Sequence, residues 1–258
     1  MKALAAGRRS KRAPLILLLL SLFLTGWVYA ALSPAADAET GSAGEVKQGE
    51  ALFQSNCSTC HGNQGQGTDI GPSLIGVGAA SADFQLSTGR MPMAANAPQA
   101  PVKTPTFTSE EIAAMSAFVG SLGPGPHIPT DDQVDPAKGN AAKGMQLFRT
   151  NCAMCHNAVG AGGALSRGKV APPLYEVTPR EIYEAMLTGP QSMPVFNEAS
   201  VTPEGKRDII AYLVEQRDPS PGGLSLGSLG PVSEGLWVWV IGLGSLIGLS
   251  VWIGAKSS

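Results

Sequence analysis

The sequence contains the pattern Cys-x-x-Cys-His twice, at residues 57–61 and 152–156, and it has no cysteine outside these two motifs. Two intervening residues on a helical turn bring both sulfurs to the same side, and the histidine that follows then faces the same group. This spacing is typical of haem attachment through two thioether bonds, with the histidine as the proximal ligand of the iron. The predicted attachment residues are Cys57 and Cys60 for one haem c and Cys152 and Cys155 for a second, with His61 and His156 as axial ligands.

Other uses of paired cysteines explain the motifs less well. A thioredoxin-type redox site needs one Cys-x-x-Cys motif near a βαβ pattern and no histidine. A zinc site can combine cysteine and histidine ligands, but it gives no reason for a histidine directly after both pairs. Two disulfides would suit four cysteines outside the cytoplasm, but they leave the spacing unexplained. The pattern therefore favours haem over thiol or zinc chemistry.

A repeat with an offset of 95 residues surrounds the motifs, since residues 47–57 match residues 142–152 at Gly, Leu-Phe and Asn-Cys. This repeat predicts a helix before each motif, with the Leu-Phe pair packed towards it. After each motif, Gly71-Pro72-Ser73-Leu74 corresponds to Ala171-Pro172-Pro173-Leu174. We expect Pro72 and Pro173 to hold an extended loop over a flat ligand face, because proline restricts φ and lacks a donor.

A capped helix closes each repeat. Thr108 followed by Glu111 forms a capping box, and Thr202 is followed by a proline at the first helical position. Each unit thus reads as helix, motif, loop, short helix, methionine and helix. The predicted organisation is an N-terminal segment (1–32), an Ala/Ser/Gly-rich tether (33–44), a first domain (45–122), a Pro-rich linker (123–137), a second domain (138–218), a second tether (219–234) and a transmembrane helix (235–255).

A methionine is predicted as the sixth iron ligand in each domain. His/Met ligation raises the potential of a cytochrome c haem. Met193 and Met91 lie in matching Thr-Gly…Met-Pro turns, where the proline holds the preceding residue extended. Met93 is the rival of Met91, because two methionines flank one proline. Met145, Met154 and Met186 are predicted to fill the core, and His127 is predicted to be a solvated linker residue.

Apolar segments at both ends indicate a membrane protein. Pro14 to Leu32 follows five basic residues, as in a secretory signal or a first transmembrane helix whose basic end stays inside. Val28-Tyr29-Ala30 is a plausible cleavage site, so cleavage and retention both stay open. Leu236 to Ala255 has no charge and is long enough to span a bilayer. We expect a cell-membrane location, with the haem domains outside the cytoplasm and the C-terminus in it.

Charge excludes one class of function. Charged residues make up 15% of the chain, and the formal net charge is −2. A nucleic-acid-binding protein usually carries an excess of basic residues, and this chain has none overall. We therefore expect no nucleic-acid partner.

Taken together, the tandem motifs, the Met-Pro turns and the two apolar ends resemble the dihaem cytochrome c subunit of the actinobacterial cytochrome bc complex, a menaquinol–cytochrome c reductase. The resemblance covers nearly the whole chain. It implies an all-α fold with two tandem class-I cytochrome c domains. It also implies partners: cytochrome b, a Rieske iron–sulfur protein and a terminal cytochrome c oxidase. Carried over, His61 and Met91 would ligate the first haem, and His156 and Met193 the second.

The expected role is electron transfer within an enzyme complex, with no catalytic residue and no quinol chemistry on this chain. The alternative is a dihaem electron-transfer subunit of a membrane dehydrogenase or of another oxidase, because such proteins use the same domains. The sequence leaves open which haem receives the electron first.

Overall fold

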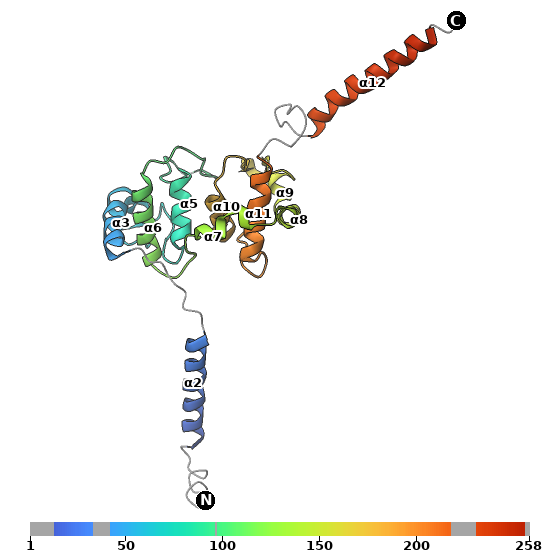
Figure 1. Ribbon diagram of the computed structural model, residues 1–258. Coiled ribbons are helices and arrows are strands. Elements are labelled where there is room, and N and C mark those ends of the chain that lie inside the picture. The colour runs from blue at the N-terminus through green and yellow to red at the C-terminus, as the bar shows by residue number, and fades with distance from the viewer. Residues whose placement is uncertain (1–12, 33–41, 96, 218–230, 256–258) are drawn as a thin grey trace, which may run out of the picture. The chain divides into compact units, whose positions relative to one another are not determined.

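A computed structural model describes residues 13–32, 42–95, 97–217 and 231–255 (Figure 1). The chain divides into two units, residues 1–40 and 41–258. In the first unit the described part is one helix, α2 (Ala13–Leu32), whose described side chains are exposed. The predicted tethers at 33–44 and 219–234, and the signal cleavage, lie largely or wholly outside what the structure describes.

The second unit contains two helical domains and one long C-terminal helix. The first domain consists of α3 (Ala43–Asn56), α4 (Ser58–His61), α5 (Ala79–Ser87) and α6 (Ser109–Ser121). The second consists of α8 (Ala141–Asn151), α9 (Ala153–His156), α10 (Pro179–Thr188) and α11 (Pro203–Glu215). Between them lie α7 (Asp131–Val134) and the 3₁₀ helix η1 (Pro136–Lys138), and α12 (Pro231–Ala255) follows. The order of helices and motifs in each domain is the one that the repeat predicts.

Side-chain caps set where the long helices begin. Thr108 accepts a hydrogen bond from the Glu111 backbone N–H, and the Glu111 carboxylate accepts one from the Thr108 N–H, so the predicted capping box is confirmed. Thr202 caps α11, which starts with Pro203 as predicted. Ser42 forms a further capping box at the start of α3, in a stretch where sequence reasoning saw only a tether.

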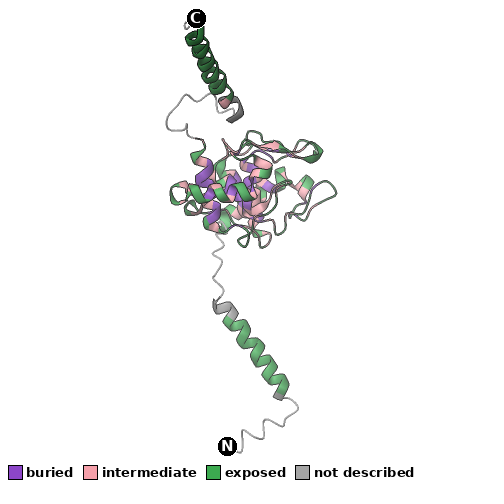
Figure 2. Ribbon diagram, turned by 90° about the vertical axis from the view of Figure 1, so that its right-hand side faces the viewer, coloured by how far each residue is buried: buried purple, intermediate pink, exposed green. Residues whose placement is uncertain are grey.

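The core of each domain is a pair of crossed helices. The rings of Phe53 on α3 and Phe118 on α6 lie 5.1 Å apart, and those of Phe148 on α8 and Tyr212 on α11 lie 5.6 Å apart. Figure 2 shows the buried residues gathered among these helices, whereas α2 and α12 are exposed along almost all of their described length. The Leu-Phe pairs of the repeat therefore place one aromatic ring in each core.

A glycine allows each helix pair to approach closely. A Cβ atom at Gly49 would overlap the carbonyl group of Ala114 on α6, and one at Gly144 would overlap that of Asp208 on α11. The recurring glycine of the repeat thus has a packing role that sequence reasoning did not assign.

Replacement of Gly49 by alanine is expected to destabilise the first domain by roughly 1 to 3 kcal/mol, because the added methyl group forces α3 away from α6. Gly44→Ala in the same helix is the matched control, since its Cβ would meet only the Ser42 hydroxyl, at 3.8 Å. The control should be neutral or stabilising by up to about 1 kcal/mol. Denaturant unfolding followed by circular dichroism measures both. Equal stability of the two variants would contradict this packing.

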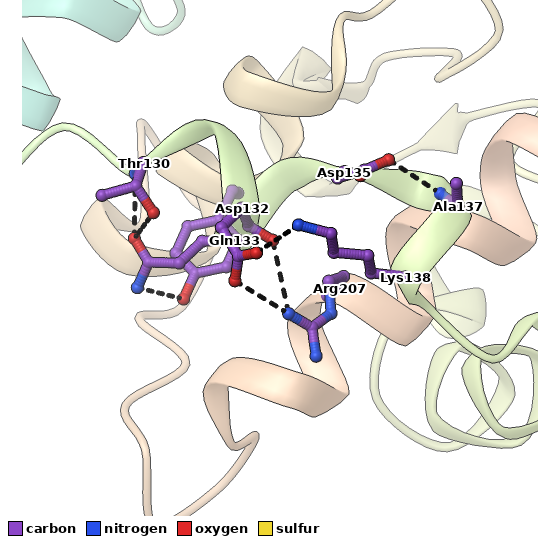
Figure 3. Close-up of polar contacts among 8 residues, drawn as sticks. Thr130, Asp132, Gln133, Asp135, Ala137, Lys138 and Arg207 are labelled. Carbon is purple, nitrogen blue, oxygen red and sulfur yellow. Dashed lines mark hydrogen bonds and ion pairs between the residues drawn. The ribbon is translucent and has the colours of Figure 1, made fainter.

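Part of the predicted linker forms ordered structure on the second domain. The Asp132 carboxylate pairs with Lys138 and lies 3.5 Å from the Arg207 guanidinium of α11 (Figure 3). Gln133 caps α7 through the Thr130 N–H and donates to the Tyr183 hydroxyl at 3.4 Å. Residues 131–138 are therefore a structural part of the second domain rather than a free spacer.

The described chain is mostly helical, with one small exception to the predicted all-α class. Strands β1 (Gly163–Ala164) and β2 (Val170–Ala171) pair in antiparallel fashion, with the 3₁₀ helix η2 (Ser166–Gly168) between them. Among the described residues, 235–255 form one candidate membrane span, and Pro14–Val28 is a shorter apolar helix.

Candidate haem sites

Both Cys-x-x-Cys-His motifs form the helical turn that their spacing predicts. The Cys57 carbonyl accepts hydrogen bonds from the N–H groups of Cys60 and His61, at 3.2 and 3.0 Å. The Cys152 carbonyl accepts from the N–H groups of Cys155 and His156, at 3.1 and 2.9 Å. Both motifs therefore carry their cysteine and histidine side chains on the same type of hydrogen-bonded helical turn.

Each motif histidine is held by a proline carbonyl. Nδ1 of His61 lies 2.8 Å from the carbonyl oxygen of Pro72, and Nδ1 of His156 lies 3.0 Å from that of Pro172. Since a carbonyl only accepts, each Nδ1 carries the proton and donates, which leaves Nε2 unprotonated and able to ligate a metal. The counterpart of Pro72 is therefore Pro172. This is the position that the match of Gly71-Pro72-Ser73-Leu74 with Ala171-Pro172-Pro173-Leu174 predicts, although we had named Pro173 as the proline that shapes the second loop.

The loops that bring these prolines to the histidines follow one hydrogen-bond pattern. The N–H of Gly67 donates to the His61 carbonyl at 2.7 Å, and the N–H of Gly162 donates to the His156 carbonyl at 2.9 Å. Both glycines adopt positive φ, 88° and 81°, which a side chain would disfavour. The match between the loops shows that the histidine geometry is a repeated feature and not a single coincidence.

Burial argues against thiolate chemistry at the first cysteine of each motif, Cys57 and Cys152. Burial, and then the neighbouring Cys155, raise the pKa of Cys152 to about 12, and burial followed by Cys60 raises the pKa of Cys57. Reactive thiols of thioredoxin type have a lowered pKa instead. No group of three or more Cys, His, Asp or Glu side chains in the described part of the chain could hold a metal ion.

The surroundings of the second motif suit a haem. Burial lowers the pKa of His156, against the opposing effect of its bond to Pro172, so the neutral imidazole that ligates iron is favoured. An open pocket beside Cys155 is lined by Leu165, Arg167, Lys169 and Ser192. Two reduced cysteines, an oriented imidazole and open space beside Cys155 suit covalent haem attachment.

The candidate methionines lie next to the domain cores. Met91 is partly buried against a cluster formed by Leu86, Ile112 and Met115, and its N–H donates to the Gln85 carbonyl at 3.0 Å. Met93 is not among the residues packed on this cluster in the described structure. Met193 packs against the core of the second domain, in the turn closed by its N–H and the Pro190 carbonyl at 3.0 Å.

The remaining methionines divide differently from the prediction. Met186 is buried and Met145 packs against the same core, as predicted. Met154 is 94% exposed, so its assignment to the core was wrong. It lies in α9, between Cys152 and Cys155. Because Cys152 is buried, the side chain of Met154, two residues further along the same turn, faces the solvent. His127 is exposed, as predicted.

Sequence reasoning missed a polar interface between the two domains, where α5 packs against α10 (Figure 1). Asp83 of α5 and Glu184 of α10 are 6% and 0% exposed. Nearby, Gln99 and Ala100 of the first domain hydrogen-bond to Val170 and Gln191 of the second. No signal in the sequence pointed to this interface, because the helical neighbours of Glu184 at three and four positions include the polar residues Arg180, Glu181 and Thr188.

Comparisons with known proteins agree with this architecture. Residues 46–123 match the cytochrome c family, and residues 139–213 match the family described as cytochrome c oxidase, cbb3-type, subunit III. Proteins named cytochrome bc1 complex cytochrome c subunit are similar over most of the chain. That of Corynebacterium diphtheriae is 41% identical over 99% of both chains. That of Mycobacterium tuberculosis strain H37Rv is 45% identical over 94% of this chain and 90% of its own, and that of Mycobacterium leprae is 43% identical over 94% and 87%.

Proposed function

Since this chain belongs to the family of cytochrome bc1 complex cytochrome c subunits, we propose that it is the membrane-anchored dihaem relay of a menaquinol-oxidising bc complex. Two covalently bound haem c groups would supply one-electron transfer between the Rieske iron–sulfur protein and a terminal cytochrome c oxidase. Cytochrome b would be the further partner, and the quinol step would take place outside this chain. The observation that carries the proposal is the histidine–proline geometry, present once in each of two cytochrome c domains.

The chain's own groups have distinct tasks in this role. The four cysteines would hold the two haems by thioether bonds, and the Pro72 and Pro172 carbonyls orient His61 and His156 so that Nε2 of each would be the iron ligand. Met91 and Met193 would fill the sixth positions, which closes the iron to oxygen and peroxide and raises its potential.

Membrane attachment follows from the long apolar helix at residues 235–255. With Lys256 on the cytoplasmic side, both haem domains lie outside the cytoplasm, where a Rieske protein and an oxidase can reach them. The N-terminal apolar segment either adds a second anchor or is removed as a signal.

Met91→Leu is expected to abolish a methionine–iron absorption band of the first haem, whereas Met93→Leu is expected to leave it unchanged. The reason is that Met91 packs into the core next to α5 and α6, and leucine keeps its bulk without the sulfur. The oxidised spectrum of the purified full chain measures both variants. Loss of the band in Met93→Leu alone would assign the ligand to Met93 instead.

Purification of the chain from native membranes in mild detergent tests the proposed function. Haem staining and mass spectrometry should find two covalent haems on this chain, together with cytochrome b and a Rieske protein. A particle that instead contains a dehydrogenase, or an oxidase without cytochrome b, would replace this function by the alternative. The second domain matches the family of cbb3-type oxidase subunit III, so an oxidase subunit is the stronger of these two alternative functions.

A further inference from the structure

The first domain carries an extension directly after its predicted methionine ligand. Seventeen positions separate Met91 from the helix cap Thr108, whereas nine separate Met193 from Thr202. We call residues 92–104, of which all but residue 96 are described, the Met91 loop. The Lys103 N–H donates to the Thr88 carbonyl at 3.2 Å, and Lys103 Nζ donates to the Pro92 carbonyl at 2.7 Å. The loop is therefore closed at its base, next to the end of α5.

The far part of the Met91 loop hydrogen-bonds to the second domain. The Gln99 side-chain amide donates to the Val170 carbonyl at 2.7 Å and accepts from the Val170 N–H at 2.9 Å. The N–H of Ala100 donates to the Gln191 side-chain oxygen at 3.1 Å. Ala100 is only 3% exposed. These three hydrogen bonds fix the position and orientation of Gln99 and Ala100 against the second domain.

The two anchoring points lie on the segments that present the axial ligands of the second haem site. Val170 is two residues before Pro172, whose carbonyl holds His156. Gln191 is two residues before Met193, and it adopts a φ of 61°, a left-handed conformation that is uncommon for a residue other than glycine. Gln191 combines this uncommon backbone conformation with a side-chain contact between the two domains, which suggests a functional constraint.

We propose that Gln99 and Gln191 are positioning residues that lock the Met91 loop onto the His156 and Met193 segments and so set the separation of the two haem sites. This role rests on the proposed function, because a relay needs a fixed spacing for electron transfer from one haem to the other. In the described part of the chain no hydrogen bond joins either glutamine to a predicted iron ligand, so each acts through the backbone group that it binds.

The test uses the full haem-loaded chain in detergent, with Gln99→Ala and Gln191→Gly. Glycine suits the positive φ of residue 191 and removes only the side chain. Gln146→Ala, at an exposed position of α8, is the control. Hydrogen exchange should become about tenfold faster at the Val170 amide in Gln99→Ala and about fivefold faster at the Ala100 amide in Gln191→Gly, as expected for the loss of these bonds.

The same variants should also slow electron transfer between the haems, measured after flash reduction of one haem by a photosensitiser. The methionine–iron bands and both reduction potentials should stay as in the unmodified chain. Unchanged amide exchange would overturn the contact. Faster exchange with an unchanged transfer rate, or a slower rate accompanied by altered bands or potentials, would overturn the positioning role. Since no partner is needed, failure here is distinguishable from failure to purify with cytochrome b.

Discussion

Replacement of Cys152 and Cys155 by alanine is expected to halve the covalent haem content of the chain, leaving the first site loaded and the second empty. Both thioether bonds of the second site are lost, and its histidine alone would hold haem only reversibly. Cys152 is also part of the buried core of its domain, together with Phe148 and Ile182, so that domain should lose stability as well. Haem assay against protein concentration, with the intact mass of the chain, measures the change.

The reciprocal variant, with Cys57 and Cys60 replaced by alanine, is the matched control. It should lose the first haem and keep the second, because the cores around Phe53 and Leu86 contain no residue of the second domain. A chain that retains its full haem content after either double replacement would contradict attachment at these motifs.

Glu184→Gln is expected to stabilise the second domain by roughly 2 to 3 kcal/mol at pH 7 and to flatten its pH dependence. Burial, and then the negative charge of Asp83, raise the pKa of Glu184 from 4.5 to about 10. The folded state therefore binds the proton more tightly than the unfolded state. Stability from this group is fully present below pH 4.5 and declines as the pH rises towards 10. Glutamine keeps the shape of the protonated acid without its titration.

Asp83 faces the same interface from α5, and burial raises its pKa too, while Glu184 and Arg180 act in the opposite direction. Both carboxylate oxygens of Glu184 are buried without a hydrogen-bond partner in the described structure, so the charged form of this side chain is disfavoured. Glu176→Gln, at an exposed position before α10, is the control and should change nothing. Denaturant unfolding between pH 5 and 9 compares the variants. An unfolding free energy of Glu184→Gln that falls as steeply with pH as that of the unmodified chain would refute the assignment.

Local patterns in the sequence predicted most of the fold and the candidate ligands. The motif turns, the caps at Thr108 and Thr202 and the helix order depend on residues a few positions apart, so the sequence reports them directly. The tetrapeptide match aligned Pro72 with Pro172, but the loop conformation was needed to show that the carbonyl of Pro172, and not that of Pro173, contacts His156. Met154 was misassigned because a methionine is apolar wherever it lies, and its exposure depends on which way the turn faces.

The interface between the domains could not be derived in this way. Gln99 and Val170 are 71 residues apart, and no periodicity links them. The sequence around Glu184 is that of a helix surface residue. Glu184 is buried because α5 packs over it, and helix propensity does not predict such a tertiary contact. The greater length of the Met91 loop can be counted in the sequence, but length alone does not say what a loop contacts.

In the proposed function, this chain carries electrons through two haems from the Rieske protein of a quinol-oxidising complex to a terminal oxidase. The most direct measurement mixes menaquinol rapidly with the purified complex and follows the haem b and haem c absorbance together. We predict reduction of two haem c groups for each copy of this chain, and loss of that reduction when the Rieske protein is removed. Haem c groups that stay oxidised while haem b is reduced, or that are reduced equally well without the Rieske protein, would contradict the account.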